Sequence, residues 1–297
     1  MREMIKPKPL PPAGMIAIVA PAGPMEADLV FEGEAFLKKM GYEVLIAPSC
    51  FERKGYLAGE SDAARAQDIM MMFADDEIGA ILSMRGGYGA NRLLPYFGDF
   101  KFSHYPKPFI GYSDITYLHL YLNQQHHVIT YHGPMIKDLL AEDELTNTHF
   151  FNVIGGNNEF DIEDVPYFNA HLAPVSGTLV GGNLSIICST LGTIHEIDTK
   201  DKILFLEEVN EPTYAIDRML MQLSYSGKLY DASGIVLGDF NVEEKEATER
   251  LLKEVLMAFR KPIAAHVPSG HCRPLYTLPL GANVTLKPQH RKIILGS

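Results

Sequence analysis

Three side chains in this sequence could together perform acyl transfer, namely Ser113, Glu207 and His271. A hydroxyl nucleophile needs a base that removes its proton and a third group that orients this base and stabilises its cation. Histidine is largely neutral near pH 7 and can accept the proton, while a carboxylate can hold the imidazolium that forms. The three residue types therefore indicate a serine hydrolase whose active-site residues, far apart in the chain, must meet in space.

The surroundings of Ser113 favour a nucleophile. The apolar run 108–112 predicts a buried strand, and residues 114–120 predict a helix that begins directly behind it. A strand-to-helix turn without a loop exposes the hydroxyl, and the first free amides of the helix then point at the group that the oxygen attacks. The alternative interpretation is an ordinary helix N-cap, because serine before aspartate is a common capping sequence.

A glycine-rich segment, RGGYG at 85–89, follows a predicted strand that ends at Met84. Glycines allow backbone amides to approach a ligand closely, so the segment could bind a dinucleotide, bind a phosphate or donate an oxyanion-hole amide. The G-x-G-x-x-G spacing and the Gly-Lys-Ser/Thr ending of a phosphate loop are both absent, which disfavours the two nucleotide interpretations. An oxyanion donor and a plain tight turn remain.

Glu207 and Glu208 close an apolar strand predicted for 203–206. A partly buried carboxylate at a strand end needs a partner, and alternation along the strand lets only one of the two face a cleft. We take Glu207 as the residue that orients the base. For Glu208 the favoured interpretation is a solvated residue that opens a loop.

His271 follows the turn sequence VPSG at 267–270, which would hold an imidazole on a short loop. The adjacent Cys272 is an alternative nucleophile, but neighbouring side chains on an extended segment point to opposite faces. Three further histidines, His126, His127 and His132, cluster in the sequence without the spacing of a metal site. We therefore expect neither a metal nor another cofactor.

Composition limits the possible partners. The 297 residues are 46% hydrophobic, and 37 acidic against 26 basic residues give a formal charge of -11, which disfavours binding to nucleic acid or anionic membranes. No apolar stretch approaches the ~20 residues that span a bilayer, and the first residues, MREMIKP, lack the apolar core of a signal peptide. Three cysteines without C-x-x-C spacing suggest free thiols. We expect a cytoplasmic protein with no nucleic-acid or membrane partner.

Alternating strand and helix patterns between residues 16 and 123 predict an α/β fold with a doubly wound parallel sheet. The polar segment 141–174 is interpreted as a linker, and the short strands beyond it predict a smaller, β-rich α+β domain. The expected domains are 1–160, which carries the nucleophile, and 161–297, which carries the glutamate and the histidine. The active site is then expected at the domain interface.

Six motifs between about residues 16 and 281 together resemble the L,D-carboxypeptidase family of serine peptidases. In chain order they are RGGYG (85–89), GYSDIT (111–116), GGNLS (181–185), LFLEE (204–208), IDRML (216–220) and GH (270–271). Six collinear motifs make the resemblance far more specific than any one of them. Because the serine motif is not G-x-S-x-G, no α/β-hydrolase fold is implied.

The resemblance implies a two-domain cytoplasmic enzyme, commonly a homodimer, that removes the terminal D-alanine from murein tetrapeptides during cell-wall recycling. It assigns the nucleophile to Ser113, the orienting acid to Glu207 and the base to His271. The oxyanion amides would come from Asp114 and Gly87, with Gly86 as the alternative. The sequence departs from many relatives at 275–276, where Leu-Tyr stands in place of an expected asparagine, so fine substrate contacts could differ.

Two other functions remain open. A related branch of the same family hydrolyses microcin C, a peptidyl-nucleotide antibiotic, and often stacks the nucleotide on tryptophan. This chain has no tryptophan, although tyrosine or phenylalanine could also stack. A periplasmic-type binding protein would share two α/β lobes. It would, however, need an export signal, and it would have no use for a set of Ser, Glu and His at strand ends. Hydrolysis of murein tetrapeptides is therefore the leading hypothesis.

Overall fold

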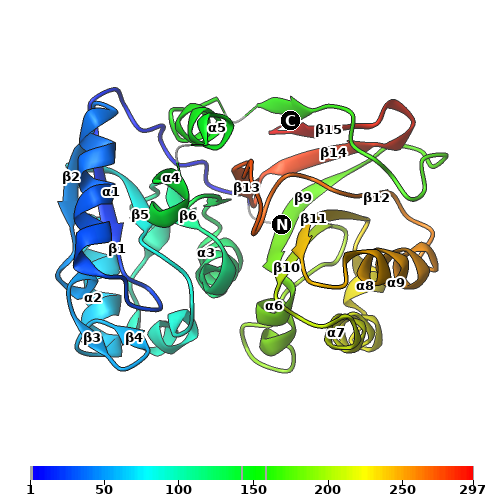
Figure 1. Ribbon diagram of the computed structural model, residues 1–297, viewed down its shortest axis with the longest axis horizontal. Helices are drawn as coiled ribbons and strands as arrows, with labels where there is room; N and C mark the ends of the chain where they lie inside the picture. Colours follow the sequence, from blue (N-terminus) through cyan, green and yellow to red (C-terminus); the bar gives the residue numbers. More distant parts are fainter. Residues whose placement is uncertain (1–2, 142, 158, 297) are drawn as a thin grey trace. The chain divides into compact units, whose positions relative to one another are not determined.

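The computed structural model describes residues 3–141, 143–157 and 159–296, which form two compact units (Figure 1). The first unit contains Met1–Asn157 together with Tyr276–Leu278, and the second contains Asn158–Leu275 and Pro279–Ser297. Each unit has its own sheet and its own buried core. None of the described helices is long and apolar enough to cross a membrane.

The first unit contains a six-stranded sheet with the order β13-β7-β6-β5-β1-β2, although only Leu278 of the edge strand β13 belongs to this unit. The pairs β1–β2, β1–β5, β5–β6 and β6–β7 are all parallel. The central strands are continuous apolar runs because helices cover both faces of such a sheet. The strands are β1 (Met15–Val19), β2 (Glu43–Ile46), β5 (Ile78–Ser83), β6 (Phe109–Gly111), β7 (Thr130–His132) and β13 (Leu278–Leu280).

Helices alternate with these strands, as the sequence pattern predicts for a doubly wound sheet. They are α1 (Ala27–Lys39), α2 (Asp62–Ala74), α3 (Thr116–His126), α4 (Ile136–Leu139) and α5 (Glu144–Ile154). The short helices η1 (Pro48–Cys50), η2 (Ala90–Tyr96), η3 (Phe102–His104) and η4 (Ser113–Ile115) are 3-10 turns. A separate hairpin joins β3 (Arg53–Lys54) to β4 (Leu57–Ala58).

The second unit has a seven-stranded sheet with the order β12-β11-β10-β9-β14-β15-β8. The strands β9 to β12 run parallel, whereas β14, β15 and β8 pair antiparallel at the other side of β9. The strands are β8 (Phe160–Ile162), β9 (Val175–Asn183), β10 (Ile203–Val209), β11 (Gly234–Asn241), β12 (Ile263–Ala264), β14 (Asn283–Lys287) and β15 (Lys292–Leu295). The predicted fold class, a parallel-sheet α/β domain followed by a separate β-rich domain, is confirmed.

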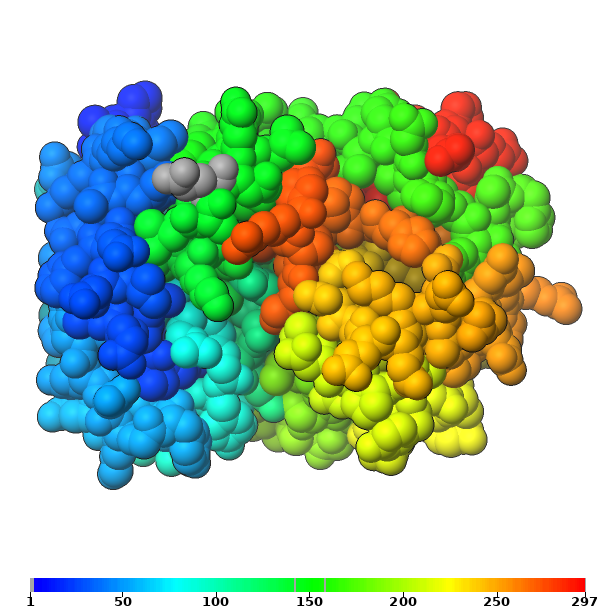
Figure 2. Space-filling view, viewed as in Figure 1, coloured from blue at the N-terminus to red at the C-terminus, as the bar shows by residue number. Residues whose placement is uncertain are grey.

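Helices in the second unit connect its parallel strands. They are α6 (Leu184–Thr190), α7 (Thr213–Tyr225), α8 (Lys228–Asp231) and α9 (Lys245–Met257), with the 3-10 turn η5 (Pro288–His290) near the chain end. Figure 2 shows the segment from α7 to α9, in yellow to orange, at the surface of this unit.

The interpretation of 141–174 as a linker is wrong. Helix α5 lies in this segment, and its N-cap residue Asp143 accepts a hydrogen bond from the backbone N–H of Thr146 at 3.1 Å. Phe150 and Val153 are buried on its inner face. The glycine and asparagine residues at 155–157 and the acidic residues Asp161, Glu163 and Asp164, which suggested a linker, follow this helix. Within 144–154 the apolar spacing decides the structure.

Candidate active site

Ser113 lies at the turn between β6 and the first helical turn behind it. Strand β6 ends at Gly111, and η4 begins at Ser113 itself, with α3 continuing from Thr116. Ser113 has a φ of 63°, in the left-handed region. A non-glycine residue there costs about 1–3 kcal/mol, which the surrounding structure must impose. The serine is partly exposed, whereas its neighbours Tyr112 and Asp114 are buried. This is the turn that the sequence predicts for a nucleophile.

Gly86 lies directly against this turn. A Cβ atom at Gly86 would be 2.9 Å from Ser113 Cβ, 3.1 Å from Ser113 Oγ and 3.5 Å from the Asp114 nitrogen. Only glycine therefore fits beside the serine. The next residue, Gly87, has a φ of 111°, which also favours glycine. The structure thus brings the glycine-rich loop, the serine hydroxyl and the Asp114 amide to one place, as an oxyanion hole would require.

Substitution of Gly86 by alanine is expected to lower the rate of substrate cleavage by about 100-fold, because the new methyl group displaces the Ser113 hydroxyl from its reactive geometry. Gly98→Ala is the control for backbone strain without a clash, since Gly98 has a φ of 50° and nothing lies within 4 Å of a Cβ there. The measurement is kcat/KM for both variants, with circular dichroism to verify folding. Equal activity of Gly86→Ala and the wild type would show that the close approach of Gly86 to Ser113 does not affect the reaction.

The Asp114 side chain connects the nucleophile turn to the glycine-rich loop. Its Oδ2 accepts a hydrogen bond from the backbone N–H of Ala90 at 2.8 Å, and the residue is 1% exposed. Burial raises the pKa of this carboxyl to about 6, although the amides of Ala90 and Gly89 and the charge of Arg65 favour its ionised form. Sequence reasoning assigned only the Asp114 amide and missed this role of the side chain.

Arg65 of α2 contacts the glycine-rich loop 85–89 through a hydrogen bond to Gly89. Its side chain is fully buried and donates hydrogen bonds to the carbonyl oxygens of Pro21 and Gly89 and to Asp62 Oδ1, the last at 2.5 Å. Asp62 also accepts from Arg92 Nε at 2.8 Å. A buried arginine is uncommon unless it is paired, and here it joins Gly89 of the loop to Pro21 behind β1. No sequence motif indicated Arg65.

Asp114→Asn is expected to change how stability depends on pH. The carboxyl pKa is about 6 in the folded protein against 3.8 for an ordinary aspartate, so this group's stabilising contribution is full below pH 3.8 and is lost as pH rises through 6. Asparagine cannot ionise and still accepts the Ala90 N–H. From pH 4 to pH 7.5 the unfolding free energy of the variant should therefore improve relative to the wild type by on the order of 2 kcal/mol.

Urea unfolding at both pH values, followed by circular dichroism, measures this difference. Asp99→Asn is the matched control, because Asp99 is an exposed carboxylate in the same unit. A stability difference between Asp114→Asn and wild type that is the same at pH 4 and pH 7.5 would contradict the expectation.

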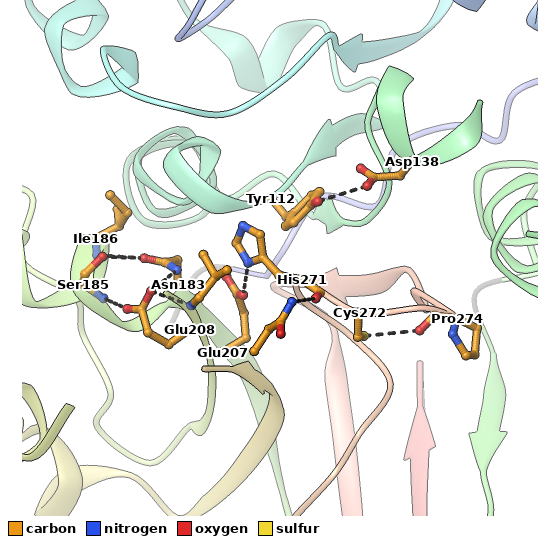
Figure 3. A network of polar contacts seen from close by, with 12 residues as sticks. Tyr112, Asp138, Asn183, Ser185, Ile186, Glu207, Glu208, His271, Cys272 and Pro274 are labelled. Atoms are coloured by element: carbon orange, nitrogen blue, oxygen red, sulfur yellow. Dashed lines mark hydrogen bonds and ion pairs between the residues drawn. The ribbon is translucent and has the colours of Figure 1, made fainter. Parts of the chain in front are cut away.

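In the second unit, Glu207 and His271 form a close pair (Figure 3). Glu207 Oε2 lies 2.7 Å from His271 Nδ1, the Glu207 side chain is fully buried and the His271 side chain is 18% exposed. An ionised carboxylate can only accept, so Nδ1 carries the proton and donates it to the hydrogen bond. Nε2 is then the nitrogen that can act as a base. The structure thus places the Glu207 carboxylate against the His271 imidazole, and the roles of orienting acid and base stay a prediction.

The loop that carries His271 is fixed to the ends of β10 and β11. Gly270 has a φ of 116°, and a Cβ there would be 2.8 Å from Glu207 Cβ. The backbone N–H of Asp239 donates to Ser269 O at 2.9 Å, and Asn241 Nδ2 donates to His271 O at 3.1 Å. These contacts hold the imidazole over the carboxylate.

The interpretation of Glu208 as a solvated loop residue is wrong. Strand β10 continues to Val209, so Glu208 is part of the strand and is 2% exposed. Its carboxylate accepts hydrogen bonds from Asn183 Nδ2 at 3.0 Å and from the backbone N–H of Ser185 at 2.7 Å, as Figure 3 shows. The expected alternation along the strand holds. The Glu207 side chain contacts His271, whereas the Glu208 side chain points to the other face of β10 and contacts Asn183 and Ser185.

The alternative candidates have other roles in the structure. Cys272 is partly exposed, and its Sγ donates to Pro274 O at 3.3 Å. His126 is buried, and burial lowers its pKa to about 4. Over residues 3–141, 143–157 and 159–296, no group of three or more His, Cys, Asp or Glu side chains is arranged to hold a metal ion.

The structure thus assembles the expected residues in two groups. Ser113, Asp114 and the glycine pair belong to the first unit, and Glu207 and His271 belong to the second.

Comparison with known proteins identifies the family. Residues 16–133 match the LD-carboxypeptidase N-terminal domain, and residues 176–286 match the LD-carboxypeptidase C-terminal domain. The probable murein peptide carboxypeptidase of Bacillus subtilis is 35% identical over 301 residues, covering 98% of this chain and 94% of that protein. The fold and the relatives define a carboxypeptidase, and the chain belongs to the LD-carboxypeptidase family.

Solved structures agree with this assignment. The muramoyltetrapeptide carboxypeptidase from Oxalobacter formigenes has a TM-score of 0.80 and 30% identity, covering 95% of this chain and 97% of that one. The microcin C7 self immunity protein MccF has a TM-score of 0.90 over 99% of this chain and 98% of its own. At 21% identity, this second likeness shows a shared fold.

Proposed function

We propose that this protein is a serine-type L,D-carboxypeptidase that removes the terminal D-alanine from murein tetrapeptides, with Ser113, His271 and Glu207 as its catalytic triad. The observation that carries the proposal is the 2.7 Å contact between the buried Glu207 carboxylate and His271 Nδ1. The left-handed turn at Ser113 supports it. The substrate class follows the names of the murein and muramoyltetrapeptide carboxypeptidases that the chain resembles.

The proposed reaction is acyl transfer. His271 Nε2 removes the Ser113 proton, and Oγ attacks the carbonyl carbon of the L-to-D bond. The amides of Asp114 and of Gly87, or alternatively Gly86, stabilise the oxyanion by about 3 kcal/mol each. The tetrahedral intermediate then expels D-alanine, whose amine takes the proton from His271. Water, activated by the same histidine, releases the acyl group from Ser113.

This mechanism requires Ser113 and His271 to come within hydrogen-bond reach of each other during catalysis. We propose accordingly that domains 1–160 and 161–297 each supply part of the active site. We further propose that the enzyme acts in the cytoplasm as a homodimer and without a metal. The formal charge of -11 favours a small peptide over nucleic acid as its partner. Sedimentation analysis of the purified protein tests the dimer, and a monomer at micromolar concentration would contradict it.

Mass spectrometry of a synthetic tetrapeptide, L-Ala-γ-D-Glu-diaminopimelate-D-Ala, tests the activity. The expected result is the loss of one alanine with wild-type protein and no loss with the Ser113→Ala variant. The tetrapeptide with lysine in place of diaminopimelate, run in parallel, defines the preferred third residue. An intact tetrapeptide after incubation with folded wild-type protein would refute the proposed function.

Hydrolysis of a microcin C-type peptidyl-nucleotide is the second candidate, favoured by the MccF-like fold. The absence of tryptophan from the sequence weighs against it, because an aromatic platform for the nucleotide would have to come from tyrosine or phenylalanine. The same assay with an aminoacyl sulfamoyl adenosine distinguishes the two functions. Faster cleavage of this compound than of the tetrapeptide would establish the second candidate.

A further inference from the structure

Strand β10 is irregularly paired on one side of Glu207. Leu206 pairs with Leu237 of β11, but Glu208 pairs with Phe240, so two β11 residues lie opposite Glu207. These two residues bind the histidine loop instead. The Asp239 N–H donates to Ser269 O at 2.9 Å, and a Cβ at Gly238 would be only 2.4 Å from that oxygen. This bulge leaves space for the loop that carries His271. As a consequence, the position of Glu207 is not fixed by regular strand pairing with β11.

On its other side β10 is held by β9, where Glu207 pairs with Asn183. The Asn183 side chain donates to Glu208 Oε1 at 3.0 Å, and Glu208 Oε2 accepts the Ser185 N–H at 2.7 Å. Asn183 Oδ1 in turn accepts from Ser185 Oγ at 2.8 Å. We call these three residues, Asn183, Ser185 and Glu208, the Glu208 network. It connects the ends of β9 and β10 to the start of α6.

A carboxylate at this position is energetically unfavourable unless it is hydrogen-bonded. Burial raises the pKa of Glu208, and the charge of Glu207 raises it further, while hydrogen bonds from Val209, Asn183 and Ser185 favour the ionised form. An apolar side chain would avoid the desolvation cost if packing alone were needed. The directional hydrogen bonds are what a carboxylate adds here, and they act on the residue adjacent to the triad acid.

We propose that Glu208 is a positioning residue for Glu207. Its hydrogen bonds to Asn183 and Ser185 hold the end of β10 so that Glu207 Oε2 stays within hydrogen-bond distance of His271 Nδ1. As far as rates are concerned, this inference rests on the proposed carboxypeptidase function. The hydrogen bond itself can be observed without any substrate.

The experiment is a double-variant cycle with Glu208→Gln and Asn183→Asp. Glu208→Gln keeps the size of the side chain, but its single oxygen can accept from Asn183 or from Ser185 and not from both. Asn183→Asp removes the donor to Glu208 and places two carboxylates together. In the double variant the glutamine donates to the new carboxylate at 183 and accepts from Ser185, which restores these two contacts with donor and acceptor exchanged. The Val209 N–H, which donates to Glu208 Oε1 at 2.8 Å in the wild type, is not restored.

Each single variant is expected to lower kcat by about 10- to 100-fold with KM within about twofold, because Glu207 loses its alignment with the base. The double variant should recover part of this loss, a coupling that independent structural damage would not produce. Ser189→Ala is the matched control, since it removes an exposed hydroxyl of the same helix, α6, which donates within that helix to Ile186 O at 2.5 Å; its kcat should stay near that of the wild type. Full kcat in both single variants, or no recovery in the double variant, would overturn the proposal.

Proton NMR supplies a readout that does not depend on the substrate. The proton shared by His271 Nδ1 and Glu207 should give a far-downfield resonance in the wild type that is lost or displaced in Glu208→Gln and returns in the double variant. An unchanged resonance in Glu208→Gln would refute the positioning role. A protein that fails to cleave the tetrapeptide, yet shows this pattern of resonances, would refute the proposed function and leave the positioning role supported.

Discussion

Replacement of Ser113 by alanine is expected to reduce cleavage of the murein tetrapeptide by about 10⁴- to 10⁶-fold, because the substitution removes the oxygen that we propose as the nucleophile. The fold should survive. Ser113 is partly exposed at the end of β6, and the smaller alanine fits the same space. At a φ of 63°, alanine has backbone strain similar to that of serine. The loss of rate would therefore reflect chemistry and not unfolding.

The measurement is single-turnover cleavage by purified variant and wild-type protein at equal concentration, with thermal unfolding to verify the fold. Cys272→Ala is the informative control, because Cys272 adjoins the base and is the alternative nucleophile considered above; this variant should remain active. A serine-directed fluorophosphonate should label wild type at Ser113 and fail to label Ser113→Ala. Activity of Ser113→Ala within tenfold of the wild type would place the nucleophile elsewhere.

Glu207→Gln is expected to lower kcat by about 10⁴-fold. In the wild type the carboxylate accepts the Nδ1 proton of His271 at 2.7 Å, which leaves Nε2 unprotonated in the neutral imidazole. The glutamine amide can instead donate to Nδ1 and thereby favour the tautomer that carries its proton on Nε2. That tautomer cannot accept the Ser113 proton. In addition, glutamine provides no negative charge to stabilise the imidazolium.

The adjacent carboxylate provides the comparison for Glu207→Gln. Glu208→Gln is expected to cost far less, about 10- to 100-fold, since Glu208 acts on Glu207 and does not touch the base. Both variants remove one buried negative charge from β10, so general electrostatic or folding effects should be similar. Comparison of kcat for the two variants therefore isolates the contact with His271, and a larger loss for Glu208→Gln would move the orienting acid by one residue.

Local patterns in the sequence were enough to predict the fold class and to indicate the family. Uninterrupted apolar runs such as 108–112 are typical of strands that are buried on both faces, so they predict the parallel sheet of the first unit. The immediate change from strand to helix at Ser113 predicts its exposed turn. The strand pattern of 108–112 and the helix pattern of 114–120 can both be recognised from neighbouring residues alone. Six collinear motifs identified the family before any contact was known.

Other features depended on the tertiary structure. The domain boundary between 160 and 161 stays a prediction, and the structure assigns Tyr276–Leu278 to the first unit. Helix α5 replaced the expected linker because its few apolar residues, spaced on one face, are buried against the rest of its unit. In the sequence, the polar residues of such a segment outweigh the few apolar ones that become buried.

The detailed geometry of the candidate site also came from the tertiary structure. The sequence could nominate Glu207 and His271, but only folding decides that Oε2 and Nδ1 lie 2.7 Å apart. The same holds for the Asp114 contact with Ala90 and for the Glu208 network, which no motif predicted. The physical reason is that burial and hydrogen bonding of a carboxylate depend on donors contributed by distant strands and loops, whereas the local pattern records only where the side chain leaves its own strand.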